Sequence, residues 1–210
     1  MFTKNRIQKA IIAVLMVAGS QAFAEGGQVF FHYGKSSLAN DRGGQVFTDA
    51  GGATTRNDDK DGWNVGAGLN LPLLPKLGPG DLLGEIMVDY SHFSKKKVTQ
   101  ASSVLLGAAT TKEVTVSGLT VLVAPKYKVS FMDGKLNPWI IPVGLAFLVN
   151  SPPSDNTSYL DVGAQVGVGV EYAVLKELSI GLAYRNTFSA HEIDTDTSYS
   201  TADLYVGVNF

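Results

Sequence analysis

The sequence predicts an all-β fold, an eight-stranded antiparallel up-and-down transmembrane β-barrel, and three patterns lead to this prediction. Residues 160–173, LDVGAQVGVGVEYA, alternate an unbroken apolar row with a row of polar residues and glycines. Side chains of a strand point alternately to its two faces, so this strand is apolar on one side and polar on the other. Long polar connections alternate with tight turns along the chain, and aromatic residues gather near the strand ends. Barrels of outer membranes share these features.

The N-terminus predicts export. Lys4, Arg6 and Lys9 form a basic segment, residues 10–19 form an apolar segment, and Ala22-Phe23-Ala24 forms a cleavage site. This order is typical of a signal peptide, and the apolar segment is too short to span a bilayer. We therefore expect residues 1–24 to be removed and residues 25–210 to form the outer-membrane β-barrel.

Composition excludes several functions. Without residues 1–24 the chain carries 14 Lys and Arg against 19 Asp and Glu, a net charge of −5. No basic stripe interleaves with aromatic residues, so we expect no nucleic-acid partner. The absence of cysteine excludes thiolate metal sites and cysteine nucleophiles. His32 and His191 lack partners at ligand spacing, so the sequence predicts no metal site and no cofactor.

In eight segments, apolar residues alternate with polar or small residues, as expected of β-strands. We expect strands at residues 28–34, 62–71, 82–93, 113–129, 139–149, 160–173, 178–185 and 203–210. Asp133-Gly134 and residues 174–177 predict tight turns. Residues 72–81 contain three prolines and two glycines, which we expect to interrupt the ladder.

The alternation also assigns the two faces of each strand. In the fifth segment we expect Trp139, Ile141, Val143, Leu145, Phe147 and Val149 to face outward. The predicted outer aromatic girdle contains Tyr33, Trp63, Tyr90, Phe93, Phe147, Tyr184 and Phe188. The predicted inner girdle contains Tyr127, Trp139, Tyr172 and Phe210. Such girdles mark the two membrane interfaces.

A family resemblance rests on three segments: residues 161–172 (DVGAQVGVGVEY), residues 137–147 (NPWIIPVGLAF) and the ending Tyr205-Val206-Gly207-Val208-Asn209-Phe210. The chain resembles the small eight-stranded outer-membrane barrels, a group that includes the OmpA-type transmembrane domain and the OmpX, OmpW and PagL types. The resemblance implies recognition of the C-terminal Phe210 by the barrel-assembly machinery, location in the bacterial outer membrane, and contact with its lipid and lipopolysaccharide. It is architectural and says little about activity. We expect a monomer.

The inward rows predict a charge network in the lumen. Its members are Glu85, Asp89, Lys126, Asp161, Glu171, Arg185 and Asp203. We expect Lys126 to lie beside Glu85, and Arg185 to lie between the strands that hold Asp161 and Asp203. Charges in a confined space must pair or stay hydrated. The network could line an ion path, but eight strands leave room only for side chains, which favours a plug.

One group of residues could carry chemistry. His92, Ser94 and Glu113 could serve as base, nucleophile and orienting acid in ester hydrolysis. The arrangement is similar to that of PagL, whose His-x-Ser-Asn motif and glutamate deacylate lipid A, although Lys95 stands here in place of the Asn. The alternative is that His92 and Ser94 are polar residues at the membrane interface.

Lys95, Lys96 and Lys97 follow the outer girdle along the chain. They could bind lipopolysaccharide phosphates, or they could be an ordinary solvated charge run. The sequence as a whole favours a non-enzymatic outer-membrane protein that displays four surface loops. A lipid A deacylase-like esterase and a narrow channel for small or hydrophobic solutes are the alternatives.

Overall fold

The computed structural model describes residues 26–39, 60–99, 111–151, 160–190 and 197–210. The predicted signal peptide, His191 and most of the long polar connections lie outside this part. Within it, no helical segment has the length and hydrophobicity needed to cross a bilayer.

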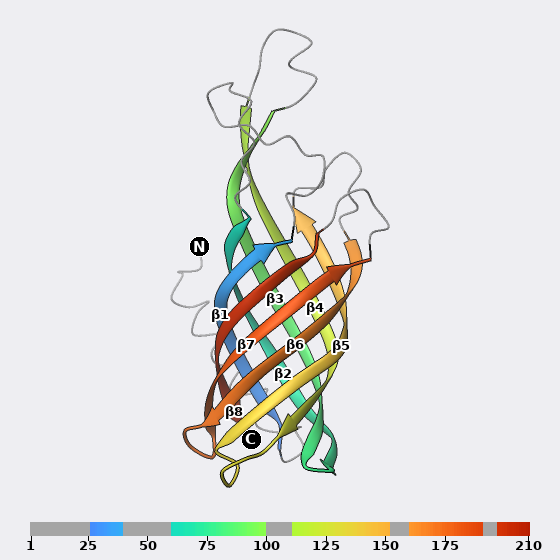
Figure 1. Ribbon diagram of the computed structural model, residues 1–210. Coiled ribbons are helices and arrows are strands. Elements are labelled where there is room, and N and C mark those ends of the chain that lie inside the picture. Colours follow the sequence, from blue (N-terminus) through green and yellow to red (C-terminus); the bar gives the residue numbers. More distant parts are fainter. Residues whose placement is uncertain (1–25, 40–59, 100–110, 152–159, 191–196) are drawn as a thin grey trace, which may run out of the picture.

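The strands form one closed antiparallel barrel in chain order, with β1 also paired to β8 (Figure 1). They are β1 (Gln28–Leu38), β2 (Asp61–Leu77), β3 (Gly80–Thr99), β4 (Thr111–Val129), β5 (Leu136–Ser151), β6 (Leu160–Ala173), β7 (Leu178–Ser189) and β8 (Tyr199–Asn209). Closure gives every strand two neighbours, so no edge strand is left unpaired. The predicted fold class is therefore confirmed.

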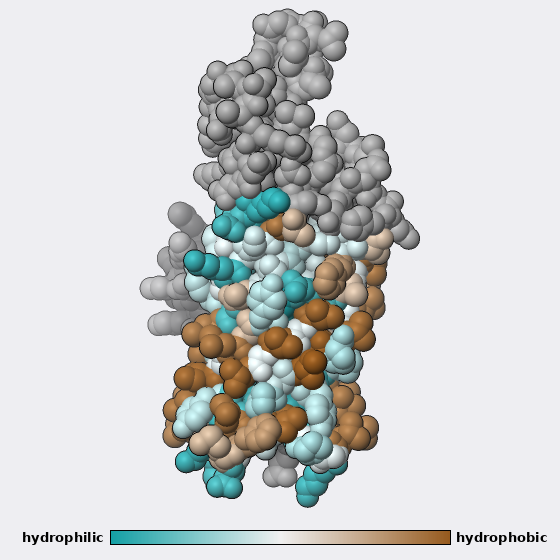
Figure 2. Space-filling model, viewed as in Figure 1, coloured by the Kyte–Doolittle hydropathy of each residue, from teal (hydrophilic) through white to brown (hydrophobic). Residues whose placement is uncertain are grey.

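The alternation predicted for residues 160–173 is present along β6, which has the same bounds. Asp161, Gln165 and Glu171 are buried in the lumen, whereas Val168 and Tyr172 are about half exposed on the outer wall. Exposed Val, Leu, Ile and aromatic side chains form a belt around the wall, and hydrophilic residues lie at the turns (Figure 2). An exposed apolar belt of this size indicates a surface that lipid covers.

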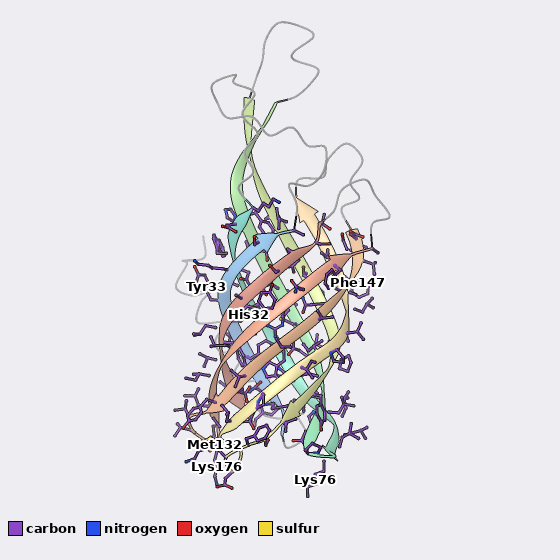
Figure 3. The ribbon with its side chains drawn as sticks, viewed as in Figure 1. His32, Tyr33, Lys76, Met132, Phe147 and Lys176 are labelled. Carbon is purple, nitrogen blue, oxygen red and sulfur yellow. The ribbon has the colours of Figure 1, made fainter. Side chains whose placement is uncertain are left out.

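The turns that join β2 to β3, β4 to β5 and β6 to β7 lie at one end of the barrel, marked by Lys76, Met132 and Lys176 (Figure 3). Met132, Asp133 and Gly134 all have positive φ angles, of 53°, 56° and 82°. The tight turns predicted at Asp133-Gly134 and at residues 174–177 are present. Phe210 lies at the same end, where its backbone bonds to Gly26 and Gly27 next to β1.

The segment from Pro72 to Asp81 differs from the expectation that prolines would interrupt the ladder. β2 continues to Leu77, and β3 begins at Gly80. The ladder shifts register between Pro72 and Leu74 and again between Leu74 and Leu77. These irregularities accommodate the prolines, because a bulge relieves the need for a ladder donor. Positive φ at Lys76 and Gly78 then allows a short turn.

β5 also corrects the sequence interpretation. Trp139 and Ile141 were expected on the outer wall, but their side chains are 4% and 1% exposed and face the lumen. Their neighbour Ile140 is 46% exposed instead. The register with β6 shifts between Ile141 and Gly144, and a bulge exchanges the two faces of a strand at that point. Val143 and Leu145, beyond the shift, face outward as expected.

The outer aromatic girdle is present with one exception. Tyr33 stacks on Trp63 at 6.5 Å between ring centroids, and Tyr90 meets Trp63 edge-on at 5.9 Å. Phe93, in contrast, is 2% exposed and contacts the inward ring of Tyr199 at 6.2 Å. Phe93 is an odd-numbered residue of β3 and shares the parity of the buried lumen residues rather than of the lipid-facing row. In the predicted inner girdle, Trp139 is likewise a lumen residue.

Candidate functional site

The lumen holds a cluster of paired charges at its centre. The Glu85 carboxylate accepts a hydrogen bond from Lys126 Nζ at 2.8 Å and another from Arg185 Nη2 at 3.1 Å. Arg185 Nη1 also donates to Asp203 Oδ2 at 3.3 Å. The four side chains come from β3, β4, β7 and β8, and each is at most 3% exposed. These contacts therefore tie strands from around the barrel together through its interior.

Trp139 is the largest addition that the structure makes to this cluster. Its ring lies below the Lys126 ammonium, at 4.1 Å from Nζ to the ring centroid, and its Nε1 donates to the Tyr205 hydroxyl at 2.9 Å. Tyr205 in turn donates to Glu171 at 3.2 Å. A Cβ at Gly169 would lie 2.4 Å from the Trp139 ring, so a glycine is required there. The glycine-rich inward row thus makes room for inward aromatic rings.

A second polar group lies toward the turn end. Glu171 accepts hydrogen bonds from Gln28 Nε2 at 2.9 Å and from Lys128 Nζ at 3.0 Å. Gln28 Oε1 accepts from Asn70 at 2.7 Å, which links β1 to β2. These residues line a cavity of about 600 Å³ at this mouth of the barrel. The hydrogen bond from Tyr205 to Glu171 links this group to the cluster around Trp139.

A third group surrounds His32 toward the other end. The His32 imidazole lies 3.6 Å from Asp89 and 3.8 Å from Asp203. Asn64 Nδ2 donates to both of these carboxylates, at 3.0 and 2.6 Å. The sequence analysis found no partner for His32 at ligand spacing, and these two neighbours come from other strands, β3 and β8. The described residues contain no cluster of three potential metal ligands.

The seven predicted network residues therefore all lie in the lumen, and the predicted pair of Lys126 with Glu85 is present. Within the described part of the chain, Arg185 forms ion pairs with Glu85 and Asp203 but none with Asp161. Asp161 instead accepts a hydrogen bond from the Thr197 hydroxyl at 3.2 Å. The additional contact between Arg185 and Glu85 could not be read from the sequence, because these residues are not on adjacent strands.

The candidate catalytic residues are spread along β3 and β4. His92 faces outward and stacks on Trp63 at 5.3 Å between ring centroids. The backbone register pairs His92 with Ser117 and Lys97 with Glu113. Five residues of strand, roughly 16 Å, thus separate the His92 position from the Glu113 position. The side chains of Ser94 and Glu113 lie outside the described part.

A register shift between His92 and Lys95 also bears on this group. Alternation restarts after a bulge, so the spacing of two residues does not by itself place His92 and Ser94 on one face. Beyond the shift, Lys95, Lys96 and Lys97 pair with Thr115, Val114 and Glu113. Nothing is described of these lysine side chains, and their proposed contact with lipopolysaccharide stays a prediction.

Comparison with known protein families and with curated proteins finds no match. Solved structures do match. The outer membrane protein OprG from Pseudomonas aeruginosa is 10% identical with a TM-score of 0.52, over 90% of this chain and 98% of that chain. Neisserial surface protein A is 14% identical with a TM-score of 0.51, over 88% of this chain and 96% of that chain.

The outer membrane enzyme PagL matches at 14% identity and a TM-score of 0.48, over 87% of this chain and 99% of that chain. Identities this low carry information about the fold alone. The closed barrel and its apolar belt agree with the fold of OprG and of Neisserial surface protein A. The chain therefore has the fold of the small eight-stranded bacterial outer-membrane β-barrels.

Proposed function

We propose that this protein is a non-enzymatic outer-membrane barrel, closed to ions, whose rigid wall displays its long connections for contact with other surfaces. The strand ends that flank the connections from β1 to β2, β3 to β4, β5 to β6 and β7 to β8 all lie opposite the tight turns. In outer-membrane barrels the short turns are periplasmic and the longer loops are extracellular. The long connections would then meet the cell exterior.

The observation that carries this proposal is the packed centre of the lumen. Glu85 is 0% exposed and is held by two cations from β4 and β7, while the Trp139 ring packs against Lys126. An ion path would need hydrated space where these side chains touch one another. Charges that are paired in this way support a rigid scaffold rather than a pore.

The lack of conductance is tested in planar bilayers. The purified barrel, shown to be folded by heat-modifiable migration on a gel, is expected to give no discrete conductance steps. A variant carrying Glu85→Ala, Lys126→Ala and Trp139→Ala together serves as the comparison, because it removes the central side chains. Discrete steps from the parent protein would contradict the closed lumen and favour the channel alternative.

The display role is tested by replacing the four long connections with short Gly-Ser segments while keeping the strands intact. Sucrose-gradient fractionation shows whether the parent and the variant both reach the outer membrane. If the connections carry the function, whole cells with the shortened variant lose adhesion to host or bacterial surfaces that cells with the parent retain. Adhesion that is unchanged in a correctly located variant would refute the role.

A further inference from the structure

The outer wall carries an open groove near the end opposite the tight turns. It has a volume of about 830 Å³, centres on β1, β8 and β7, and reaches residues of β2 and β6 on either side. Around the wall, the register places Lys35, Ala202 and Tyr184 side by side in one row. Ala202 is the small residue of this row, so a hollow remains between its two long neighbours. The lining is mainly apolar, with Leu182 and Leu204 in the row below.

Aromatic rings border the groove. Tyr33, which projects from the edge of the wall in Figure 3, is 63% exposed and stacks on Trp63. Tyr184 stands across the groove and is 48% exposed. Tyrosine and tryptophan prefer the height at which lipid headgroups meet acyl chains. The groove thus runs from the hydrocarbon zone up to the interface.

A smaller pocket of about 260 Å³ adjoins the upper end of the groove. The two hollows share Lys35, Gly62, Tyr184 and Ala202, and Ser37 and Ser200 add hydroxyl groups to the smaller one. Asp61 also lines it, but that residue already has an interaction of its own. An apolar groove below a hydroxyl-lined pocket has the shape of a site for one amphiphilic molecule.

Lys35 determines the charge of that molecule. It is exposed on the outer face of β1, at the junction of the two hollows. Within the part of the chain that the structure describes, no carboxylate forms an ion pair with it. A lysine at the membrane interface whose charge is not neutralised attracts a phosphate, because Lys binds phosphate as a point charge.

We propose that this groove binds lipid A, the phosphorylated and acylated glycolipid of the outer leaflet, with an acyl chain between Tyr33 and Tyr184 and a phosphate at Lys35. The inference rests on the outer-membrane location and on the loop end facing outward, but it does not depend on the role of the loops or on the closed lumen. It assigns a function to the wall itself, centred on β1, β7 and β8 rather than on β3, the strand that contains Lys95, Lys96 and Lys97.

Tryptophan fluorescence provides the test. The chain has two tryptophans: Trp63 lines the groove, and Trp139 is buried in the lumen. The barrel is inserted into vesicles of phosphatidylcholine with brominated acyl chains, which quench an indole that they touch. Unbrominated lipid A is then added at a few mole per cent. Occupation of the groove protects Trp63, so fluorescence recovers by more than the mole fraction of lipid A added. The Trp63→Phe variant, which retains Trp139, should show no such recovery.

Two variants test separately how the charge of Lys35 and the hollow at Ala202 contribute to binding. Lys35→Gln should weaken protection by lipid A about fivefold, since one cation near the membrane surface contributes ~1 kcal/mol. Ala202→Phe should abolish selective protection by filling the groove. The matched controls are Lys176→Gln, at the turn end, and Ala67→Phe, a small-to-large change on the outer face of β2. Both controls should behave as the parent.

The outcomes are decisive because insertion is checked separately by heat-modifiability. Recovery proportional to mole fraction in a folded parent barrel overturns the proposal. Fluorescence recovery that is equal in the parent and in Lys35→Gln also overturns it. Protection of Trp63 that rises with protein concentration in the absence of lipid A overturns it as well, because that would indicate a second copy of the chain on this face. Failure to insert at all would instead contradict the outer-membrane location.

Discussion

The central carboxylate Glu85 is expected to dominate the stability of the barrel. In Glu85→Gln the side chain keeps its shape but loses the charge that Lys126 and Arg185 share at 2.8 and 3.1 Å. Removing one partner of a buried ion pair costs about 3–5 kcal/mol. Arg185 keeps Asp203 at 3.3 Å, and Lys126 keeps the Trp139 ring at 4.1 Å. We therefore expect the free energy of unfolding to fall by about 3 kcal/mol, the lower end of this range.

The assay is equilibrium unfolding by guanidinium in phospholipid vesicles, followed by tryptophan fluorescence and by heat-modifiable migration. The guanidinium concentration at the midpoint of unfolding should fall, while the slope of the free energy of unfolding against guanidinium concentration stays constant. Asp161→Asn is the matched control, because within the described residues the donors to that carboxylate are neutral: the Thr197 hydroxyl and the Val162 backbone N–H. Its expected cost is ~1 kcal/mol.

A double variant checks the physical reason. Adding Lys126→Met to Glu85→Gln removes the cation that was left without its carboxylate, so most of the lost stability should return. If Glu85→Gln unfolds within ~1 kcal/mol of the parent, water in the lumen screens these charges and the buried-pair reasoning is wrong. If the double variant is no better than the single one, loss of packing rather than an unpaired charge explains the effect.

Three further predictions concern other parts of the chain. Trp139→Phe should lower the free energy of unfolding by roughly 2 kcal/mol, because the bond to Tyr205 and part of the attraction to Lys126 are lost; the same denaturant titration measures it, and an unchanged midpoint would contradict it. Mass spectra of lipid A incubated with the protein should show unchanged acylation, with no difference for His92→Ala, since the register holds Glu113 far from His92; deacylation that His92→Ala abolishes would restore the esterase hypothesis. The mass of the protein from outer membranes should correspond to a chain that begins at Glu25, and a retained N-terminus would contradict cleavage after residue 24.

Local patterns were sufficient to locate the eight strands, because each strand depends on which residues alternate and where turn formers lie. Several strands extend beyond their predicted bounds, among them β2, β3 and β8. The sequence indicated β6 at its observed bounds, and it placed Glu85, Lys126 and Arg185 on inward rows. Pairing of Lys126 with Glu85 also followed, since adjacent strands bring such positions together. Lipid outside and a crowded lumen inside impose opposite preferences on alternate residues, and the sequence records these preferences directly.

The positions of the β-bulges could not be predicted from these local patterns. One register shift brought Trp139 and Ile141 into the lumen, and another interrupts β3 after His92. A bulge inserts a residue in one strand relative to its partner, so it depends on the pairing of two strands and leaves little trace in either sequence. The Trp139 contact with Lys126 in the central cluster therefore could not be predicted.

The sequence by itself determined that the chain forms strands with one apolar and one polar face, and which carboxylates and cations the barrel encloses. Only the tertiary structure decided which of them touch: Arg185 reaches Glu85 across the lumen, and His32 lies between Asp89 and Asp203. It also decided that Ala202 leaves a hollow between Lys35 and Tyr184. Alternation is a property of one strand, whereas contacts across a closed barrel depend on the register of all eight.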